Sequence, residues 1–238
     1  ALEQTLLQLA VRGLLVPQAP QDEPASTLLA RIRTEKDRLI ADGQIKRDKP
    51  LPPITDKEKP FELPVGWEWA RLNDLIRISS GDGLTAAQMA PGGTVPVYGG
   101  NGVNGHHDLA NVEEPTLVIG RVGYYCGSVH VTPTRAWVTD NAFITRYPKA
   151  YLDMNWLYWL LVGTNLKEND SATAQPVISG RKLYPIVVAL PPLPEQSRIV
   201  TRVTALRRLC ADLRQRLADA QTSQSHLAQA LVDSTSSV

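Results

Sequence analysis

The chain has 238 residues, of which 43% are hydrophobic, and its formal net charge is +1. This length predicts one domain with extensions, and the near-neutral charge means that any nucleic-acid surface must be local. Two cysteines are too few for a disulfide framework, and no apolar run approaches the roughly 20 residues of a membrane span. With no secretory signal before the first element, the expected compartment is the cytoplasm, and no membrane partner is expected.

The first element that the pattern predicts is a helix over residues 1–12. Leu2, Leu6 and Leu9 fall on one apolar stripe of this helix. Gly13 ends the stripe, because glycine is a common residue just after a helix.

A second helix is predicted to begin at an Asp22 N-cap, with Pro24 in its first turn, and to stop at Gly43. Residues 1–43 are therefore expected to form a helical segment. Residues 44–60 are charged and rich in proline, a composition that is typical of an extended linker lying over a surface.

The texture changes at Phe61, and residues 61–190 carry short β-type runs between glycine turns, which predicts an α+β body with long loops. One strong helix is expected from Tyr151 to about Leu166, with leucines facing inward. Long loops on a small sheet framework are where recognition usually resides. The expected strands are 67–72, 75–78, 95–98, 116–121, 127–131, 142–147 and 186–190.

Residues 191–238 begin with Pro-Pro-Leu-Pro-Glu-Gln and continue as one long predicted helix whose apolar side chains keep coiled-coil spacing. A lone helix cannot bury such a seam, so we expect it to pair lengthwise with another helix. Its arginine excess between residues 197 and 220 fits either a solvated face or contact with phosphates or an acidic partner subunit. The expected pairing residues are Ile199, Val203, Leu206, Cys210, Leu213, Leu217, Leu227 and Leu231.

The sequence lacks the motifs of common catalytic sites. There is no glycine-rich phosphate loop ending in Lys-Ser or Lys-Thr, no Asn-Pro-Pro-aromatic tetrad, and no Glu-x-Lys triplet. His106, His107 and Asp108 make a loop metal conceivable, but adjacent histidines cannot face one metal from a strand, so a polar loop is favoured. We therefore expect no catalytic residue and no bound metal, and the pattern favours a binding module over an enzyme.

Five polar or glycine-rich loops are candidates for ligand contact: 79–85, 98–107, 120–125, 139–141 and 171–182. The second also fits a plain Asn-Gly hairpin turn, and the fourth fits a turn better than a contact. Amide, imidazole, hydroxyl and cationic side chains on or beside these loops have the chemistry to contact bases and phosphates. The candidate DNA contacts are Thr85, Gln88, Asn101, Asn104, His106, His107, Arg121, Tyr124, Arg135, Thr173, Gln175, Arg181 and Lys182.

The order of several short motifs adds a resemblance that spans nearly the whole chain. Each motif is weak alone, but the ordered set resembles the specificity subunit of type I restriction–modification enzymes. The matching segments are Phe61-Glu62-Leu63-Pro64 with Gly66-Trp67-Glu68-Trp69, Pro96-Val97-Tyr98-Gly99-Gly100-Asn101-Gly102, Ile119-Gly120-Arg121-x-Gly123, Thr139-Asp140-Asn141-Ala142, Gln175-Pro176-x-Ile178-Ser179, residues 190–200, and residues 1–55.

The resemblance implies a division of labour. Such a subunit carries two target recognition domains held apart by two antiparallel conserved helices, and each domain reads half of a split double-stranded DNA site. It docks modification subunits, which methylate adenine with S-adenosylmethionine, and restriction subunits, which use ATP and Mg. No cofactor is expected on this chain itself, because the chemistry belongs to the partners.

This chain departs from that pattern by holding one recognition domain, expected at 61–190, and one long spacer or dimerisation helix, expected at 191–238. Two explanations stay open. The chain is either the C-terminal half of a longer subunit or a half-subunit that pairs with a second copy of itself. An orphan DNA-binding protein dimerising through its helices, a binding module for another ligand, and an enzyme built around His106, His107 and Asp108 are the alternatives.

The resemblance also separates framework from readout. The glycine and Gln-Pro-x-Ile-Ser motifs occur in members that read different sequences, so they are expected to be framework or phosphate contacts. Arg181 and Lys182 are expected to contact phosphates. The expected base-reading residues lie between the motifs: Thr85, Gln88, Asn104, His106, His107, Tyr124, Arg135 and Thr173.

Overall fold

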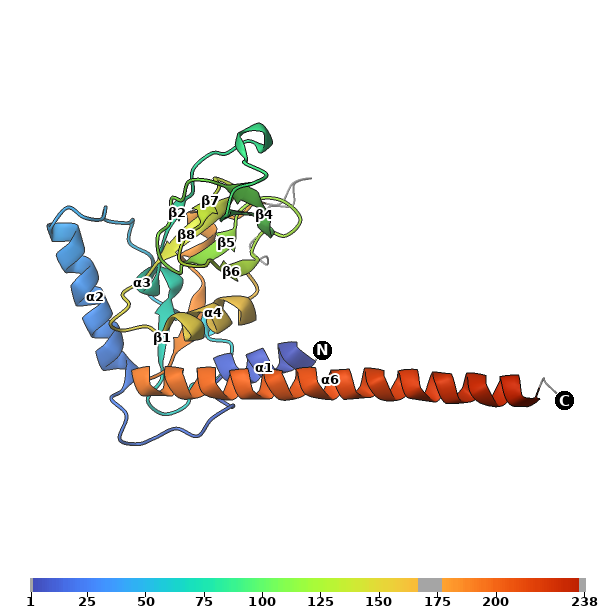
Figure 1. Cartoon of the computed structure of the whole chain (residues 1–238). Coiled ribbons are helices and arrows are strands. Elements are labelled where there is room, and N and C mark those ends of the chain that lie inside the picture. The colour runs from blue at the N-terminus through green and yellow to red at the C-terminus, as the bar shows by residue number, and fades with distance from the viewer. Residues whose placement is uncertain (1, 167–176, 236–238) are drawn as a thin grey trace. The chain divides into compact units, whose positions relative to one another are not determined.

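The computed structural model describes residues 2–166 and 177–235, with side chains in the last helix described as far as residue 229 (Figure 1). The chain forms two compact units, Ala1–Val200 and Thr201–Val238. The expected α+β body, N-terminal helices and long C-terminal helix are all confirmed. Across the described residues, none of the helices combines the length and apolar content that crossing a bilayer requires.

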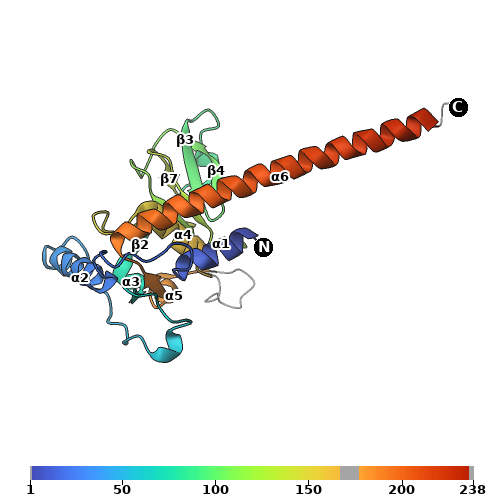
Figure 2. The ribbon, with the colours of Figure 1, turned by 90° about the horizontal axis from the view of Figure 1, so that it is seen from below.

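The first helix, α1 (Leu2–Val11), packs against α4 (Met154–Gly163) (Figure 1 and Figure 2). Gln8 donates to the carbonyl of Gly163 at 2.9 Å, which fixes the rotation of α1. The buried residues are therefore Leu6, Leu7 and Ala10, whereas Leu2 and Leu9 are 60% and 37% exposed. The predicted stripe was wrong at these two leucines, because Leu7 and Ala10 face the body instead.

The second helix, α2 (Ala25–Ala41), begins after Pro24, which occupies the N-cap position without a side-chain cap. The Asp22 N-cap prediction was wrong, because the Asp22 carboxylate instead accepts a hydrogen bond from Arg198 at 2.5 Å. The predicted stop at Gly43 is confirmed, since this glycine adopts φ +71° just beyond the helix.

Three small sheets make up the body. The first sheet pairs β1 (Glu68–Arg71) with β9 (Val187–Leu190). The second sheet has the strand order β2 (Arg77–Ser80), β8 (Ala142–Arg146), β5 (Leu117–Gly120), β6 (Val129–Val131). The third sheet has the strand order β4 (Gly102–His107), β3 (Val95–Gly99), β7 (Trp137–Val138). All pairs are antiparallel except β3 with β7. The short helices are α3 (Leu72–Leu75), α5 (Gly180–Leu183), η1 (Asp56–Glu58) and η2 (Ala86–Gln88).

Two strands escaped sequence prediction, and one was misplaced. β4 lies in the stretch assigned to the second recognition loop, and β7 is only two residues long. The strand expected at 75–78 begins only at Arg77. The residues before it form α3, where the Asp74 carboxylate accepts the backbone N–H of Arg71 at 3.3 Å.

Residues 44–60 lie against the body through arginine side chains. Arg71, which is 5% exposed, donates to the carbonyls of Pro52 and Pro53 and to Glu58. Arg77 donates to Asp48 at 2.6 Å. Proline lacks the N–H donor that a sheet requires, and these bonds give the carbonyl groups of the segment side-chain donors instead.

The last helix, α6 (Leu193–Thr235), has 43 residues and is about 64 Å long. In its first turns, Glu195 and Gln196 are buried, and Glu195 accepts a hydrogen bond from Gln18 at 3.2 Å. Burial raises the pKa of the Glu195 carboxyl, and this effect exceeds the lowering by Gln18, Trp67 and Arg198.

The helix-pairing prediction needs one correction. Ile199 and Val203 are 1% and 0% exposed in the single chain, so they are not open to another helix. The remaining pairing candidates are more accessible: Leu206 and Cys210 are half-buried, and Leu213, Leu217 and Leu227 are 56%, 60% and 66% exposed. The side chain of Leu231 lies outside the described residues.

Candidate nucleic-acid interface

The segments that carry the ordered motifs meet in one place, which we call the glycine junction: residues 80–81, 98–102, 120–123, 138–141 and 177–178. Backbone bonds tie them together. Thr139 N–H donates to the Tyr98 carbonyl at 2.8 Å, Arg121 N–H donates to the Asn141 carbonyl at 2.9 Å, and Ile178 N–H donates to the Arg121 carbonyl at 2.9 Å. Motifs separated by up to about a hundred residues are therefore parts of one local structure.

Glycine is required in this junction by close backbone approach. A Cβ atom on Gly100 would collide with the carbonyl oxygen of Val122. One on Gly120 would collide with the carbonyl oxygen of Gly100, and one on Gly81 with those of Val138 and Thr139. Since the obstacles are backbone atoms, they cannot move aside as a flexible side chain would.

Arg121 belongs to this framework. Its Nη1 donates to Ser80 Oγ and to the Asp140 carbonyl, both at 3.3 Å, and its guanidinium lies 5.4 Å from the centre of the Phe143 ring. The arginine therefore spans three segments of the junction. Its contacts support a positioning role better than the base or phosphate contact predicted for it.

The second predicted loop is a β-hairpin, whose turn is formed by Gly100 and Asn101. β3 and β4 pair from Val95 opposite His107 to Gly99 opposite Gly102, and Gly102 adopts φ +88°. Asn101 is exposed at the turn.

Strand alternation separates the polar side chains of β4. Asn104 is exposed at a β-bulge, where Val97 pairs with Gly105 and Tyr98 with Val103, so the alternation is interrupted there. Beyond the bulge, His106 is exposed on one face of the strand. His107 lies on the other face and meets the Trp137 ring edge-on at 5.3 Å, with its Nδ1 buried. His107 is therefore better suited to packing than to base contact.

Two residues that sequence reasoning missed hold the hairpin turn. Ser128 Oγ donates to the Gly100 carbonyl at 2.8 Å, and His130 Nε2 lies 3.1 Å from Ser128 Oγ. Ser128 uses its single hydroxyl proton in the bond to Gly100, so towards His130 its oxygen can only accept. The contact with His130 is therefore a hydrogen bond when Nε2 carries the hydrogen. Burial lowers the pKa of His130. The available signal was a Ser-x-His pair, with Ser128 just before β6 and His130 within it.

The third loop follows β5 and is the most exposed aromatic feature of the body. Tyr124 and Tyr125 are 79% and 49% exposed, and their rings meet edge to face at 5.0 Å. The loop starts from the junction at Arg121, so it lies next to the hairpin turn.

Other candidates take different positions. Thr85 and Gln88 are exposed and cap η2, with the Gln88 side-chain oxygen accepting from Thr85 N at 2.9 Å and Thr85 Oγ1 at 2.8 Å. They neighbour β4, since Ala90 N–H donates to the His106 carbonyl at 3.0 Å. Thus the segment that follows η2 is tied to β4 of the hairpin.

The cationic candidates divide between two regions. Arg181 is exposed in α5, and Lys182 donates to the Val177 carbonyl at 3.3 Å, which places both close to the junction. Arg135 instead pairs with Glu113 at 3.1 Å, and neither residue belongs to the segments that form the junction. The predicted contacts Thr173 and Gln175 lie outside the described residues.

The residues that the structure describes contain no group of three histidine, cysteine or acidic side chains able to hold a metal ion. His106 and His107 stand on opposite faces of β4, for the reason given by strand alternation.

Comparison with known proteins gives a family. The family model of the type I restriction modification DNA specificity domain matches residues 64–220. The specificity subunits of the Escherichia coli type I restriction enzymes EcoEI and EcoAI are 34% and 32% identical to the chain. Each match covers 98% of this chain and 44% of the relative. The chain therefore spans less than half the length of these curated relatives.

Solved structures agree on the fold. The S subunit of a type I restriction–modification system from M. genitalium has a TM-score of 0.56 at 17% identity, covering 64% of this chain and 42% of that one. A chain from a study of complex assembly and conformational transition of the type I R-M system has a TM-score of 0.57 at 21% identity, covering 87% and 56%. The chain belongs to the family of type I restriction–modification DNA specificity domains.

Proposed function

We propose that this chain is a sequence-reading DNA module without catalysis of its own, which reads one half of a bipartite site. The observation that carries the proposal is the family match over residues 64–220, which includes the whole hairpin and the whole glycine junction. The relatives are named specificity subunits of type I restriction enzymes. A DNA reader acts where DNA lies, which agrees with the cytoplasm as its compartment.

The β3–β4 hairpin is our candidate for base readout. A two-stranded β-ribbon fits the major groove of B-DNA, and side-chain amides offer the paired donor and acceptor that adenine requires. Asn101, Asn104 and His106 are exposed on this hairpin, and Tyr124 is exposed beside it. The junction beneath keeps the hairpin rigid, which lowers the cost of ordering it on DNA.

Phosphate contact is assigned to Arg181 and Lys182. Both lie in α5, which follows the junction segment at Ile178. Positive charges near the DNA phosphates strengthen binding to every sequence, because they release counterions from the DNA and do not read bases.

The long helix α6 is our candidate for a spacer. Its exposed leucines call for a second helix, supplied either by a longer chain or by a second copy, and a length of about 64 Å suits it to set the distance between two readers. Modification and restriction subunits are the proposed protein partners, and S-adenosylmethionine, ATP and Mg would act on those partners. A self-paired form would read an inverted repeat, because two-fold protein symmetry imposes two-fold symmetry on the site.

Selection of bound sequences from random duplex DNA tests this function. The wild-type chain should enrich a half-site, and His106→Ala should change the base preferred at one position, with a cost of about 1–3 kcal/mol for the lost contact. Arg135→Ala is the parallel test of the cation that lies outside the junction region. If Arg135→Ala changes the selected sequence and His106→Ala does not, readout does not lie on the hairpin.

Salt titration of binding tests the phosphate assignment. Arg181→Ala and Lys182→Ala should weaken binding to all sequences equally, each reducing the salt slope by about 1. Binding to duplex DNA that ignores salt, or methylation of DNA by this chain alone, would contradict the proposed function.

A further inference from the structure

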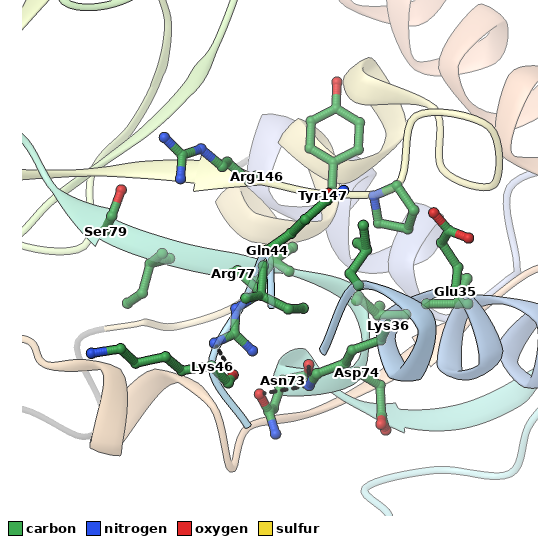
Figure 3. A pocket seen from close by; sticks show the side chains of 17 residues that line it. Glu35, Lys36, Gln44, Lys46, Asn73, Asp74, Arg77, Ser79, Arg146 and Tyr147 are labelled. Carbon is green, nitrogen blue, oxygen red and sulfur yellow. Dashed lines mark hydrogen bonds between the residues drawn. The ribbon is translucent and has the colours of Figure 1, made fainter. Parts of the chain in front are cut away.

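A groove of about 760 Å³ runs between α2 and the strand pair β2–β8. Ile32, Lys36 and Leu39 of α2 line one side, and β2 and the end of β8 line the other (Figure 3). Of the predicted DNA contacts that the structure describes, none lines this groove. Its volume is that of an ordinary ligand site.

The groove is preformed by a tight return of the chain. After α2, the left-handed Gly43 allows Gln44 and Ile45 to donate back to the Leu39 carbonyl at 2.9 and 3.3 Å. The next residue, Lys46, is held by its carbonyl, which accepts from Arg77 Nη2 at 2.8 Å. The wall formed by residues 44–46 is therefore tied to β2.

Positive charge is in excess along the groove. The β2–β8 register sets Arg77 opposite Arg146, and like charges at such positions repel each other. The Asp48 carboxylate compensates Arg77 at 2.6 Å and is shared with Lys36 at 3.3 Å. Arg146 and Lys46 are exposed and form no ion pair with the part of the chain that the structure describes.

The two carboxylates that line the groove do not balance this excess. Glu35 pairs with Arg38 at 2.7 Å, and Asp74 pairs with Arg33 at 3.0 Å. In the view of Figure 3, Arg146 and Lys46 lie towards the Ser79 end of the groove, and Glu35 lies towards the other end. The Ser79 end is therefore an open site for negative charge.

We propose that this groove docks an acidic segment of a partner protein, in which a large apolar side chain is flanked by carboxylates. The carboxylates would pair with Arg146 and Lys46. The apolar side chain would cover the partly exposed Leu39, Ile45 and Tyr147. The phosphates of DNA could pair with Arg146 and Lys46, but they would not cover these apolar atoms. Burying the apolar atoms is favourable by about 25 cal/mol per Å².

The length of the groove limits the segment. Ile32 and Leu39 are seven residues apart on α2, which is about 10 Å. An extended peptide covers that distance with about three residues. The recognition core is thus short, and a small peptide is an adequate probe.

Fluorescence anisotropy with a labelled ten-residue peptide of alternating Glu and Leu tests the proposal on the full chain. The peptide should bind, and Lys46→Glu with Arg146→Glu should weaken binding at least ten-fold. A peptide with Lys in place of Glu should not bind. The matched control is Arg31→Glu with Lys57→Glu, an equal change of net charge at exposed positions outside the groove, which should leave peptide binding unchanged.

A peptide that binds the groove variant as tightly as wild type would overturn the proposal, as would equal binding of the Lys peptide. The same proteins are titrated with a 20-base-pair duplex. If duplex affinity falls in the groove variant as much as peptide affinity, the groove is a phosphate contact and the peptide proposal fails. If the wild-type chain binds the peptide but does not bind the duplex, the proposed function fails and the groove proposal stands.

Discussion

The two compact units of the chain differ in how they satisfy their own apolar and polar groups. In Ala1–Val200, segments far apart in sequence meet through backbone hydrogen bonds. Arginine side chains such as those of Arg71 and Arg121 donate to carbonyl groups of the loops. In Thr201–Val238, Leu213 and Leu217 remain more than half exposed. The first unit builds an apolar core from its own segments, whereas the second has the surface of half an interface.

The sharpest test of a self-contained first unit is Gly120→Ala. The added Cβ meets the Gly100 carbonyl and crowds Ser128 Oγ at 2.8 Å, so we expect a loss of about 1–3 kcal/mol in the free energy of unfolding. Urea titration measures it. Gly83→Ala is the matched control, because nothing lies within 4 Å of its added methyl group. Equal stability of the two variants would show that the junction is looser than its contacts indicate.

The second unit is tested by Leu213→Asp with Leu217→Asp. If these leucines are buried against another helix, each contributes about 1.5–3 kcal/mol, and association should weaken by more than about 100-fold while the melting temperature of the body stays the same. Sedimentation equilibrium measures the association. Gln215→Asp with Thr222→Asp adds the same charge two residues away from the seam, on the opposite face.

If the seam variant (Leu213→Asp with Leu217→Asp) associates as strongly as its control, α6 is not part of the interface. A wild-type chain that stays monomeric at every concentration would contradict pairing with a second copy, and a helix from a longer chain would then be the remaining partner.

The contrast between the units also explains what the sequence could reveal. Periodicity located α2, α4 and α6, because each carries apolar side chains at helical spacing over several turns. It failed for β4, whose two glycines interrupt the alternation, and for the two-residue β7, whose partner β3 lies about forty residues earlier.

The site was predictable in part for a related reason. Glycine motifs marked the junction, but sequence alone did not show that they touch each other through carbonyl oxygens. The role of Arg121 depends on Ser80 and Asp140, which are 41 and 19 residues away in sequence. Ile199 and Val203 fitted the seam by spacing, and only the tertiary structure could show that the single chain already buries them.

Acid titration probes how tightly residues 44–60 are held to the first unit. The backbone N–H of Thr55, with Arg71 and the Thr55 hydroxyl, lowers the pKa of Glu58 from 4.5 to about 2. Its stabilising contribution is therefore present above pH 4.5 and is lost as pH falls towards 2. The deficit of Glu58→Gln should be complete above pH 4.5 and should shrink in acid, as measured by urea unfolding. A deficit independent of pH would mean that Glu58 acts through packing.

The start of α6 should show the opposite and smaller dependence. Burial raises the pKa of Glu195 above 4.5, so the folded chain holds this proton better than the unfolded chain, and stability falls as pH rises through the raised pKa. Glu195→Gln keeps an oxygen that can accept from Gln18 and removes the titration. The stability of this variant relative to wild type should therefore rise between pH 4.5 and 7.5. If it falls instead, the ion pair with Arg198 within the same helix, rather than burial, controls the Glu195 carboxyl group.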